Sequence, residues 1–218
     1  MFKHYILNQE NKPNFTLNLL CMIYITMVIL SIVLFDQILN FNFFGIQMSL
    51  SGSVVPYVFL YPISFIVLRV YGLKHVNNMI GAMILASLLF VVMAELIAYL
   101  SSNTTGIHTI LLNSIKMYIA GFIGMPAGIY ISFLVLNCLA RVNIAFNTIS
   151  LTIATIAGEI ANTLIVFPIG FHGIFTSQEI FKNIIADALL FKSIMGPILS
   201  FVAIRVINFL INKMANQI

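Results

Sequence analysis

Six long apolar segments follow one another along the chain, separated by shorter and more polar stretches. Each supplies the roughly 20 mostly apolar residues that a helix needs to cross the hydrocarbon core of a bilayer. The first is too long for the core of a secretory signal peptide, and no small-residue cleavage site follows it. The pattern predicts six membrane-spanning helices, at residues 15–35, 54–71, 78–100, 113–139, 144–171 and 184–210.

The composition supports this interpretation. Of the 218 residues, 61% are hydrophobic and 7% are charged, whereas soluble proteins carry about 25% charged residues. No polar block is long enough to form a separate soluble domain. We expect an all-α integral membrane protein of the cell inner membrane, with a cytoplasmic lead at 1–14, a single six-helix domain at 15–211 and a cytoplasmic tail at 212–218.

Some segments are expected to depart from regular helix. Pro56 and Pro62 remove backbone donors from the second span and should kink it. Pro126 and three glycines make the fourth span the one most prone to break. Residues 36–53 are expected to form an outer loop or a short re-entrant piece, 101–113 a polar loop and 172–182 the last outer loop.

Basic residues gather on one side of the predicted bundle. Lys and Arg in short loops are retained on the cytoplasmic side of a membrane. With the N-terminus inside, the outer side receives Lys116 and Lys182. The inner side receives Lys3, Lys12, Arg69, Lys74, Arg141, Arg205 and Lys213. Both termini are therefore expected in the cytoplasm; Lys192, inside the sixth span, is not counted.

The fifth span carries a continuous polar stripe. Its members, at steps of four, three, four and three residues, are Thr148, Thr152, Thr155, Glu159 and Asn162. This spacing places them on one face of a helix. A carboxylate and a carboxamide one turn apart are costly inside a membrane unless they face a wet cavity or a partner. The stripe predicts a polar site inside the bundle.

Lys192 matches Glu159 in depth. Lys192 lies eight residues after Ile184, at the outer end of the sixth span. Glu159 lies eight residues before Phe167, which is near the outer end of the fifth span, so each charge is about 12 Å below the outer surface. Three interpretations stay open: a charged pair that lines a substrate cavity, a structural pair that locks two helices, and a lysine that reaches the interface alone.

Weaker candidates lie elsewhere. Asn137, near the inner end of the fourth span, fits a ligand contact or a hydrogen bond between helices. Arg69 fits a site residue or a headgroup anchor. Tyr71 could stack on a planar ligand. The histidines have no metal-binding spacing and no basic run indicates nucleic acid, so neither a metal, a cofactor nor a nucleic acid is expected.

These residues resemble the motifs of a known family. GEIANTLIVFPIGF at 158–171 is similar to the most recognisable motif of the queuosine precursor transporter family, also called the vitamin uptake transporter family. PISFIVLRVYG at 62–72 resembles its second-helix signature. Lys192 in FKSI matches a lysine of its last helix, and Pro126 and Asn137 stand where it has a small-residue and Asp pattern. The resemblance covers spans two to six.

The chain departs from the family pattern at acidic positions. Asn162 and Asn137 stand where the family has Asp, and Ser64 and Phe65 occupy the region of a second-helix acid. The resemblance implies inward movement of a 7-deazaguanine, a queuosine precursor or the free base, by facilitated or ion-coupled transport. The departures leave proton coupling and the identity of the base open.

A guanine-like ligand suits the chemistry of these residues. Its edge presents adjacent N–H donors beside a carbonyl, so Glu159 could accept hydrogen bonds while Asn162 donates and accepts. Lys192 could meet the carbonyl or keep Glu159 ionised. The remaining expected substrate-binding residues are Thr155, Asn137, Arg69 and Tyr71. None of this needs a covalent step, so we expect no enzyme.

Other functional classes were weighed. The substrate-binding subunit of an energy-coupling-factor vitamin importer has a similar length and helix count, but needs separate ATPase partners. A rhomboid-like protease needs a Gly-x-Ser-Gly helix, whereas the similar string at 51–53 lies before the second span. The expected partners are a planar purine-like small molecule and the lipid bilayer, with a homodimer as an open option.

The distribution of basic residues gives a test of topology. Fusions of an enzyme reporter that is active only outside the cytoplasm should be inactive at the C-terminus and active after Thr104. Fusions of a fluorescent protein that folds only in the cytoplasm should give the opposite pattern. An external C-terminus would contradict the predicted orientation.

Overall fold

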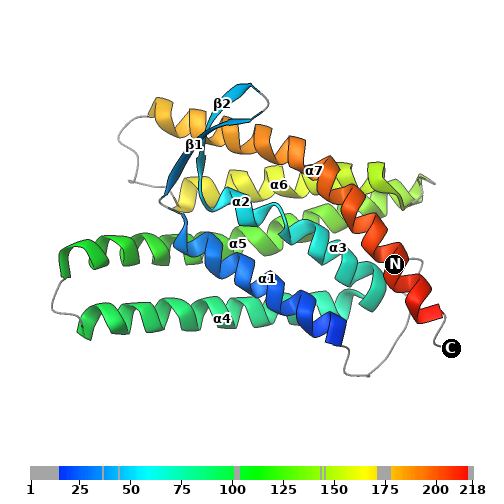
Figure 1. Cartoon of the computed structure of the whole chain (residues 1–218), viewed down its shortest axis with the longest axis horizontal. Coiled ribbons are helices and arrows are strands. Elements are labelled where there is room, and N and C mark those ends of the chain that lie inside the picture. The colour runs from blue at the N-terminus through cyan, green and yellow to red at the C-terminus, as the bar shows by residue number, and fades with distance from the viewer. Residues whose placement is uncertain are drawn as a thin grey trace.

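The computed structural model describes residues 15–215 except 36, 44, 101–103, 143, 145 and 171–177. Its helices provide six candidate membrane spans, which confirms the predicted architecture. The helices are α1 (Phe15–Val33), α2 (Val54–Tyr57), α3 (Leu60–Tyr71), α4 (Leu73–Leu100), α5 (Thr104–Arg141), α6 (Thr148–Gly170) and α7 (Gln178–Ala215). The expected lead at 1–14 and His172 lie outside the described residues. α1 begins and α7 ends at the same end of the bundle (Figure 1).

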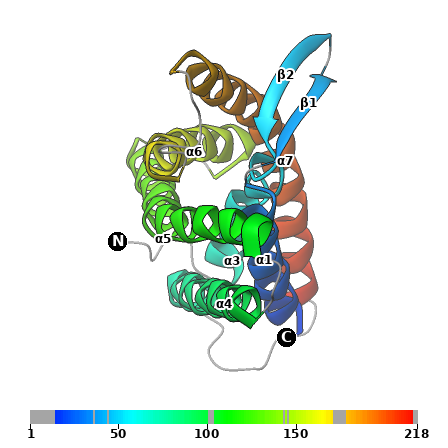
Figure 2. The same ribbon diagram turned by 90° about the vertical axis from the view of Figure 1, so that its left-hand side faces the viewer.

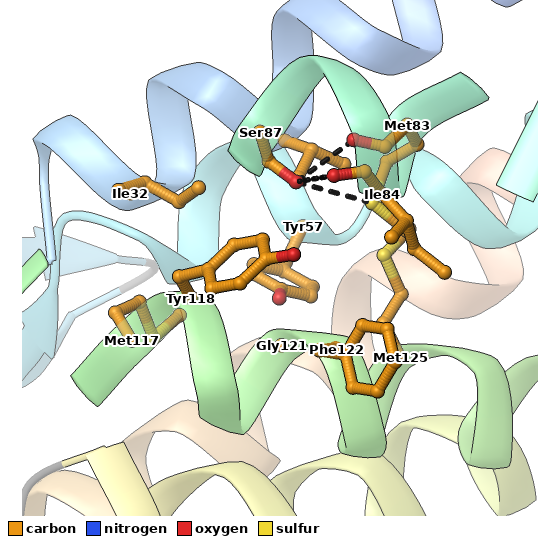
Figure 3. Close-up of a pocket in the computed structure, with 11 residues that line it drawn as sticks. Ile32, Tyr57, Met83, Ile84, Ser87, Met117, Tyr118, Gly121, Phe122 and Met125 are labelled. Carbon is orange, nitrogen blue, oxygen red and sulfur yellow. Dashed lines mark hydrogen bonds between the residues drawn. The ribbon is translucent and has the colours of Figure 1, made fainter. Parts of the chain in front are cut away.

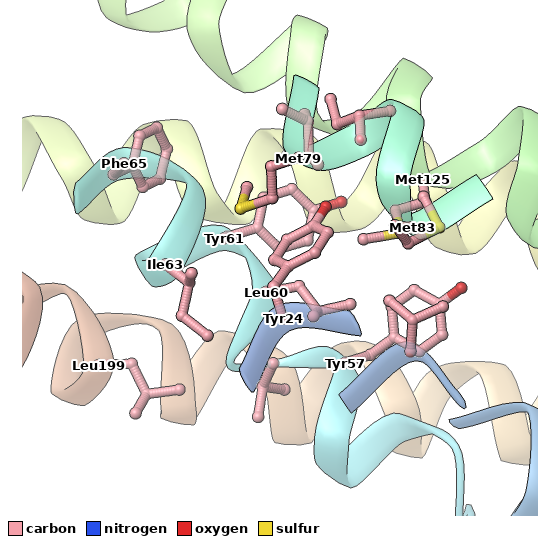
Figure 4. Close-up of a cluster of buried hydrophobic side chains, with 14 of the residues drawn as sticks. Tyr24, Tyr57, Leu60, Tyr61, Ile63, Phe65, Met79, Met83, Met125 and Leu199 are labelled. Carbon is pink, nitrogen blue, oxygen red and sulfur yellow. The ribbon is translucent and has the colours of Figure 1, made fainter. Parts of the chain in front are cut away.

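The span made of α2 and α3 lies at the centre of the bundle. In this span 78% of the residues are buried, against 22% in the spans of α1 and α4. Every residue of α3 except Arg69 is buried. Tyr24 of α1 joins Tyr57 and Tyr61 in this core, beside methionines of α4 and α5 (Figure 4). The other spans therefore pack around α3 and turn their outer faces toward lipid.

The second span breaks as the prolines predict. α2 ends at Tyr57 and α3 begins at Leu60, with a turn at Val58 and Phe59. Pro62 cannot donate to the carbonyl of Val58, and its ring would clash with that carbonyl in a regular helix. The break therefore falls one turn before Pro62.

The fourth span does not break, contrary to the prediction. α5 runs without interruption through Pro126. A proline in a membrane helix is tolerated where a neighbouring helix packs against the freed backbone. Here α6 packs closely on the turn of α5 that holds Gly124 and Gly128. The glycines therefore serve close packing rather than flexibility.

Residues 38–51, within the stretch expected to form an outer loop or a short re-entrant piece, form an antiparallel hairpin. β1 (Ile38–Phe43) pairs with β2 (Ile46–Ser51), and Gly45 takes a positive φ of 84° in the turn. The hairpin packs on α7 (Figures 1 and 2). The backbone N–H of Ser49 donates to Oδ2 of Asp187 at 2.8 Å, and the rings of Phe41 and Phe191 meet edge to face at 6.1 Å.

Two helices are longer than predicted. Residues 104–112, expected in a polar loop, are the first residues of α5, and α7 begins at Gln178, inside the expected last loop. The segment before Asn113 contains the apolar run Ile110 to Leu112. Adding residues to an existing helix costs little because the nucleus is already formed. These helices therefore extend beyond their apolar windows.

α5 and α6 approach each other most closely through facing glycines. A Cβ on Gly158 would lie 2.6 Å from the carbonyl oxygen of Gly128. A Cβ on Gly128 would contact the Tyr61 hydroxyl, the Gly158 carbonyl oxygen at 2.7 Å and Asn162 Cβ at 2.9 Å. Small residues of this kind let membrane helices pack backbone to backbone. The contact fixes α6 against both α5 and α3.

This packing predicts the effect of a single methyl group. Gly128→Ala should lower the free energy of unfolding by about 1–3 kcal/mol, because the added Cβ overlaps backbone atoms that cannot move aside cheaply. Gly81→Ala is the matched control, a helical glycine of α4 whose added Cβ would meet nothing within 4 Å. Thermal unfolding of both variants in detergent measures the difference. Equal unfolding temperatures would contradict the close approach of α5 and α6.

Candidate functional site

The polar stripe of α6 is buried at the middle of the helix. Thr155, Glu159 and Asn162 are at most 2% exposed, whereas Thr148 and Thr152 are half-buried. Glu159 lies eleven residues from each end of α6, which is about 16 Å. The carboxyl group is thus at the centre of α6. It lies deeper than the sequence predicted, which was about 12 Å below the outer surface.

Four oxygen atoms of this stripe lack a hydrogen bond. Within the described part of the chain, no partner is found for Thr155 Oγ1, Asn162 Oδ1 or either carboxylate oxygen of Glu159. Leaving a buried polar group unpaired costs about 1–3 kcal/mol, and more where the group is charged. These residues lie three and four positions apart, so their oxygens belong to neighbouring turns of one helix face. We call Thr155, Glu159 and Asn162 the acceptor cluster.

Lys192 lies beside the acceptor cluster but bonds to another residue. α7 packs against α6, and Lys192 Nζ donates to Thr163 Oγ1 at 2.9 Å. The ammonium also lies 5.8 Å from the ring centroid of Tyr57. Across the described residues, Lys192 and Glu159 make no direct ion pair, since neither carboxylate oxygen has a hydrogen-bond partner. The two charges lie on neighbouring helices, but they do not form the direct ion pair that their predicted depths suggested.

Tyr61 of α3 and Gly128 of α5 contact this turn of α6 at Gly158 and Asn162. The Tyr61 hydroxyl donates to the carbonyl oxygen of Gly158 at 2.9 Å. Gly128 of α5 lies against Asn162 Cβ. Tyr57, Tyr61 and Thr163 were not among the predicted site residues. Tyr57 ends α2 and Tyr61 lies in α3, and their distance from α6 and α7 in sequence concealed these contacts.

The acceptor cluster and Lys192 lie in a part of the chain that matches a known protein family. The model of a family described as "putative vitamin uptake transporter" matches residues 51–206. The match covers most of the chain, from the end of β2 to α7, and includes every residue of the acceptor cluster and Lys192. The chain belongs to this vitamin uptake transporter family. No curated protein and no solved structure matches it.

Three residues predicted for the site of this transporter lie away from the acceptor cluster. Tyr71 is ten residues beyond Tyr61 along α3, about 15 Å, and its ring contacts His75 at 6.3 Å between centroids. Asn137 is nine residues beyond Gly128 along α5, about 13 Å. Arg69 lies over the Phe146 ring at 5.3 Å, at the end of the bundle where α6 begins. These residues form no single site with Glu159 in this conformation.

A separate pocket of the transporter lies between α1, α2, α4 and α5 (Figure 3). Its lining is mostly Met, Ile and aromatic side chains. The hydroxyl of Ser87 is already bonded to the carbonyl oxygens of Met83 and Ile84, at 2.8 and 3.1 Å. Tyr57 lines this pocket and also contacts Lys192. The pocket is therefore mostly apolar, and Tyr57 lies between it and Lys192.

Among the described residues, no three His, Cys, Asp or Glu side chains come together as a metal site would require. The chemistry available at the acceptor cluster is hydrogen bonding and charge. Three of its four unpaired oxygens can only accept hydrogen bonds, and the Thr155 hydroxyl can donate or accept. A ligand that fits this cluster presents several N–H donors on one edge.

The bond between Lys192 and Thr163 gives a test of this geometry. Thr163→Val should lower the free energy of unfolding by about 1.5–3 kcal/mol, because it removes a buried hydrogen bond to a charged group. Thr152→Val, on the same helix at a half-buried position, is the control and should change stability little. Unfolding temperatures in detergent measure both. A Thr163→Val protein as stable as the control would contradict the arrangement.

Proposed function

We propose that the protein imports a 7-deazaguanine base, a queuosine precursor or the free base, across the cell inner membrane by facilitated or ion-coupled transport. The observation that carries the proposal is the acceptor cluster at the centre of α6, in a member of a family of vitamin uptake transporters. Transporter sites lie near the middle of the bilayer, where a cargo can be reached alternately from either side.

The edge of a guanine-like base is complementary to the acceptor cluster. The ring N–H and the exocyclic amino group of such a base are adjacent donors, and a carboxylate accepts two parallel hydrogen bonds. Glu159 would accept this pair, and Asn162 Oδ1 or Thr155 Oγ1 would accept a further N–H. Lys192, released from Thr163, would donate to the adjacent carbonyl. Tyr57 and Tyr61 supply aromatic surface beside the cluster.

Complementation tests the proposed cargo. A bacterial strain that can neither make nor import queuosine precursors should regain modified tRNA when it expresses this chain and receives a 7-deazaguanine in the medium. Reconstitution of the isolated chain in liposomes should give saturable uptake of radiolabelled 7-cyano-7-deazaguanine. Ligand binding without transport would instead support a substrate-binding subunit of an energy-coupling-factor importer. Absence of both binding and uptake would refute the proposal.

Substitutions at the cluster separate a ligand site from a structural lock. Glu159→Gln and Lys192→Met should each abolish net uptake while the protein still inserts, because each leaves an unmatched group at the site. Asn162→Ala should weaken apparent affinity with less effect on maximal rate. The double substitution should fold better than either single and remain inactive. Recovered uptake in the double variant would assign the two residues a structural role instead.

A further inference from the structure

The carboxyl group of Glu159 lies in a cluster of oxygen atoms that have no hydrogen-bond partner within the described residues. Asn162 Oδ1 and Thr155 Oγ1 are unpaired in the described part of the chain, as are both carboxylate oxygens. An ionised carboxylate donates no hydrogen bond, so it cannot pair with Asn162 Oδ1. A protonated carboxyl carries one O–H donor, and acceptors three residues ahead and four residues behind are on its own helix face. A proton on Glu159 therefore adds a donor to a cluster in which, of the unpaired oxygens, only the Thr155 hydroxyl can donate.

Lys192, the neighbouring cation, does not donate a hydrogen bond to Glu159. Lys192 Nζ is bonded to Thr163 and lies against the Tyr57 ring. Of the described titratable groups, Tyr61 from α3 and Lys192 from α7 face this turn of α6. The Tyr61 hydroxyl donates to the Gly158 carbonyl. α5 presents Gly128 and Ser132 there, neither of which carries a charge. Within the described residues, an ionised Glu159 thus accepts no hydrogen bond from these neighbouring helices, and of the unpaired oxygens beside it only the Thr155 hydroxyl can donate.

We propose that Glu159 exchanges one proton for the cargo. Without cargo, the carboxyl holds a proton and its O–H donates within the acceptor cluster. When the base binds, the O–H bond breaks, the proton passes to water, and the carboxylate accepts two N–H bonds from the base. When the base leaves on the other side, the carboxylate takes a proton from water there. This inference rests on the proposed function and assigns that site a proton-linked mechanism.

The exchange follows because the proton and the base compete for the carboxylate oxygens of Glu159. A proton and the N–H edge of the base both bind at the carboxylate oxygens of Glu159. The protonated carboxyl keeps only part of the acceptor capacity of the carboxylate. The base therefore binds the ionised form more tightly, and by linkage the proton weakens binding of the base. Inward movement of one base is then accompanied by outward movement of one proton.

Equilibrium binding tests the linkage. Affinity of the purified protein for radiolabelled 7-cyano-7-deazaguanine should rise about tenfold for each pH unit below the titration of Glu159 and then level off. Binding should release one proton, measured with a pH indicator in weakly buffered solution. The affinity of Glu159→Gln, whatever its level, should not depend on pH. Where that variant does not bind, the proton release of the unsubstituted protein decides.

Liposomes with a trapped pH indicator test the direction of exchange. Uptake of the base should make the lumen more alkaline, and an imposed inward proton gradient should slow net uptake. Uptake without a change of luminal pH, or with acidification, would overturn the inference and leave the proposed function intact. Affinity that does not vary with pH would also overturn it.

A third measurement does not depend on the identity of the cargo. The infrared spectrum of the protein without base should contain a protonated-carboxyl band that is missing from Glu159→Gln. Absence of that band would overturn the inference. If the unsubstituted protein neither binds nor transports the base, the proposed function fails, and the assignment of cargo exchange fails with it even if the band is present.

Discussion

A carboxyl group without a hydrogen-bond donor, held at the centre of a membrane span, is the constraint around which this structure is arranged. Glu159 is 2% exposed and has no hydrogen-bond partner within the described residues. Such a group is costly in an apolar medium, and in membrane proteins it marks a substrate or proton pathway. The packing of α3, α5 and α7 around α6 determines what can reach it.

The surrounding fold holds this turn of α6 in place through close contacts. Gly128 and Gly158 bring two backbones together, and the Tyr61 hydroxyl binds the carbonyl just before Glu159. On the other side, the hairpin anchors the start of α7 through the bond from Ser49 to Asp187. Asp187 precedes Lys192 by five residues, so the same helix carries the anchor and the cation. The turn of α6 that carries the cluster is thus contacted by α3 and α5, and α7 carries both the hairpin anchor and Lys192.

The sequence allowed the six spans and the buried stripe to be predicted because both are periodic and local. Apolar runs of sufficient length fix the spans, and steps of three and four residues place Thr155, Glu159 and Asn162 on one face. The break before Pro62 was predictable for a similar reason, since it depends on a missing backbone donor. The hairpin was not predicted although Ile46, Met48 and Leu50 alternate with polar residues, because the mixture of Phe, Asn, Gly and Ser at 36–53 indicated a loop or a re-entrant piece.

Contacts between distant segments could not be predicted in this way. The depth match of Glu159 and Lys192 gave their proximity, but not the bond of Lys192 to Thr163. Tyr61 meets the carbonyl of Gly158 and Tyr57 meets Lys192, contacts between segments far apart in sequence that have no local signal. The position of Asn137 and Tyr71 about 13–15 Å along their helices follows from the axial register of three helices, which no single segment specifies.

An electron cryomicroscopy structure with 7-cyano-7-deazaguanine bound is the most direct test that the acceptor cluster holds the cargo. The account predicts that the ring N–H and the amino group of the base lie within hydrogen-bond distance of the Glu159 carboxylate, with Asn162 or Thr155 beside them. A base bound in the apolar pocket beside Tyr118, or near Arg69, with Glu159 unchanged, would contradict it.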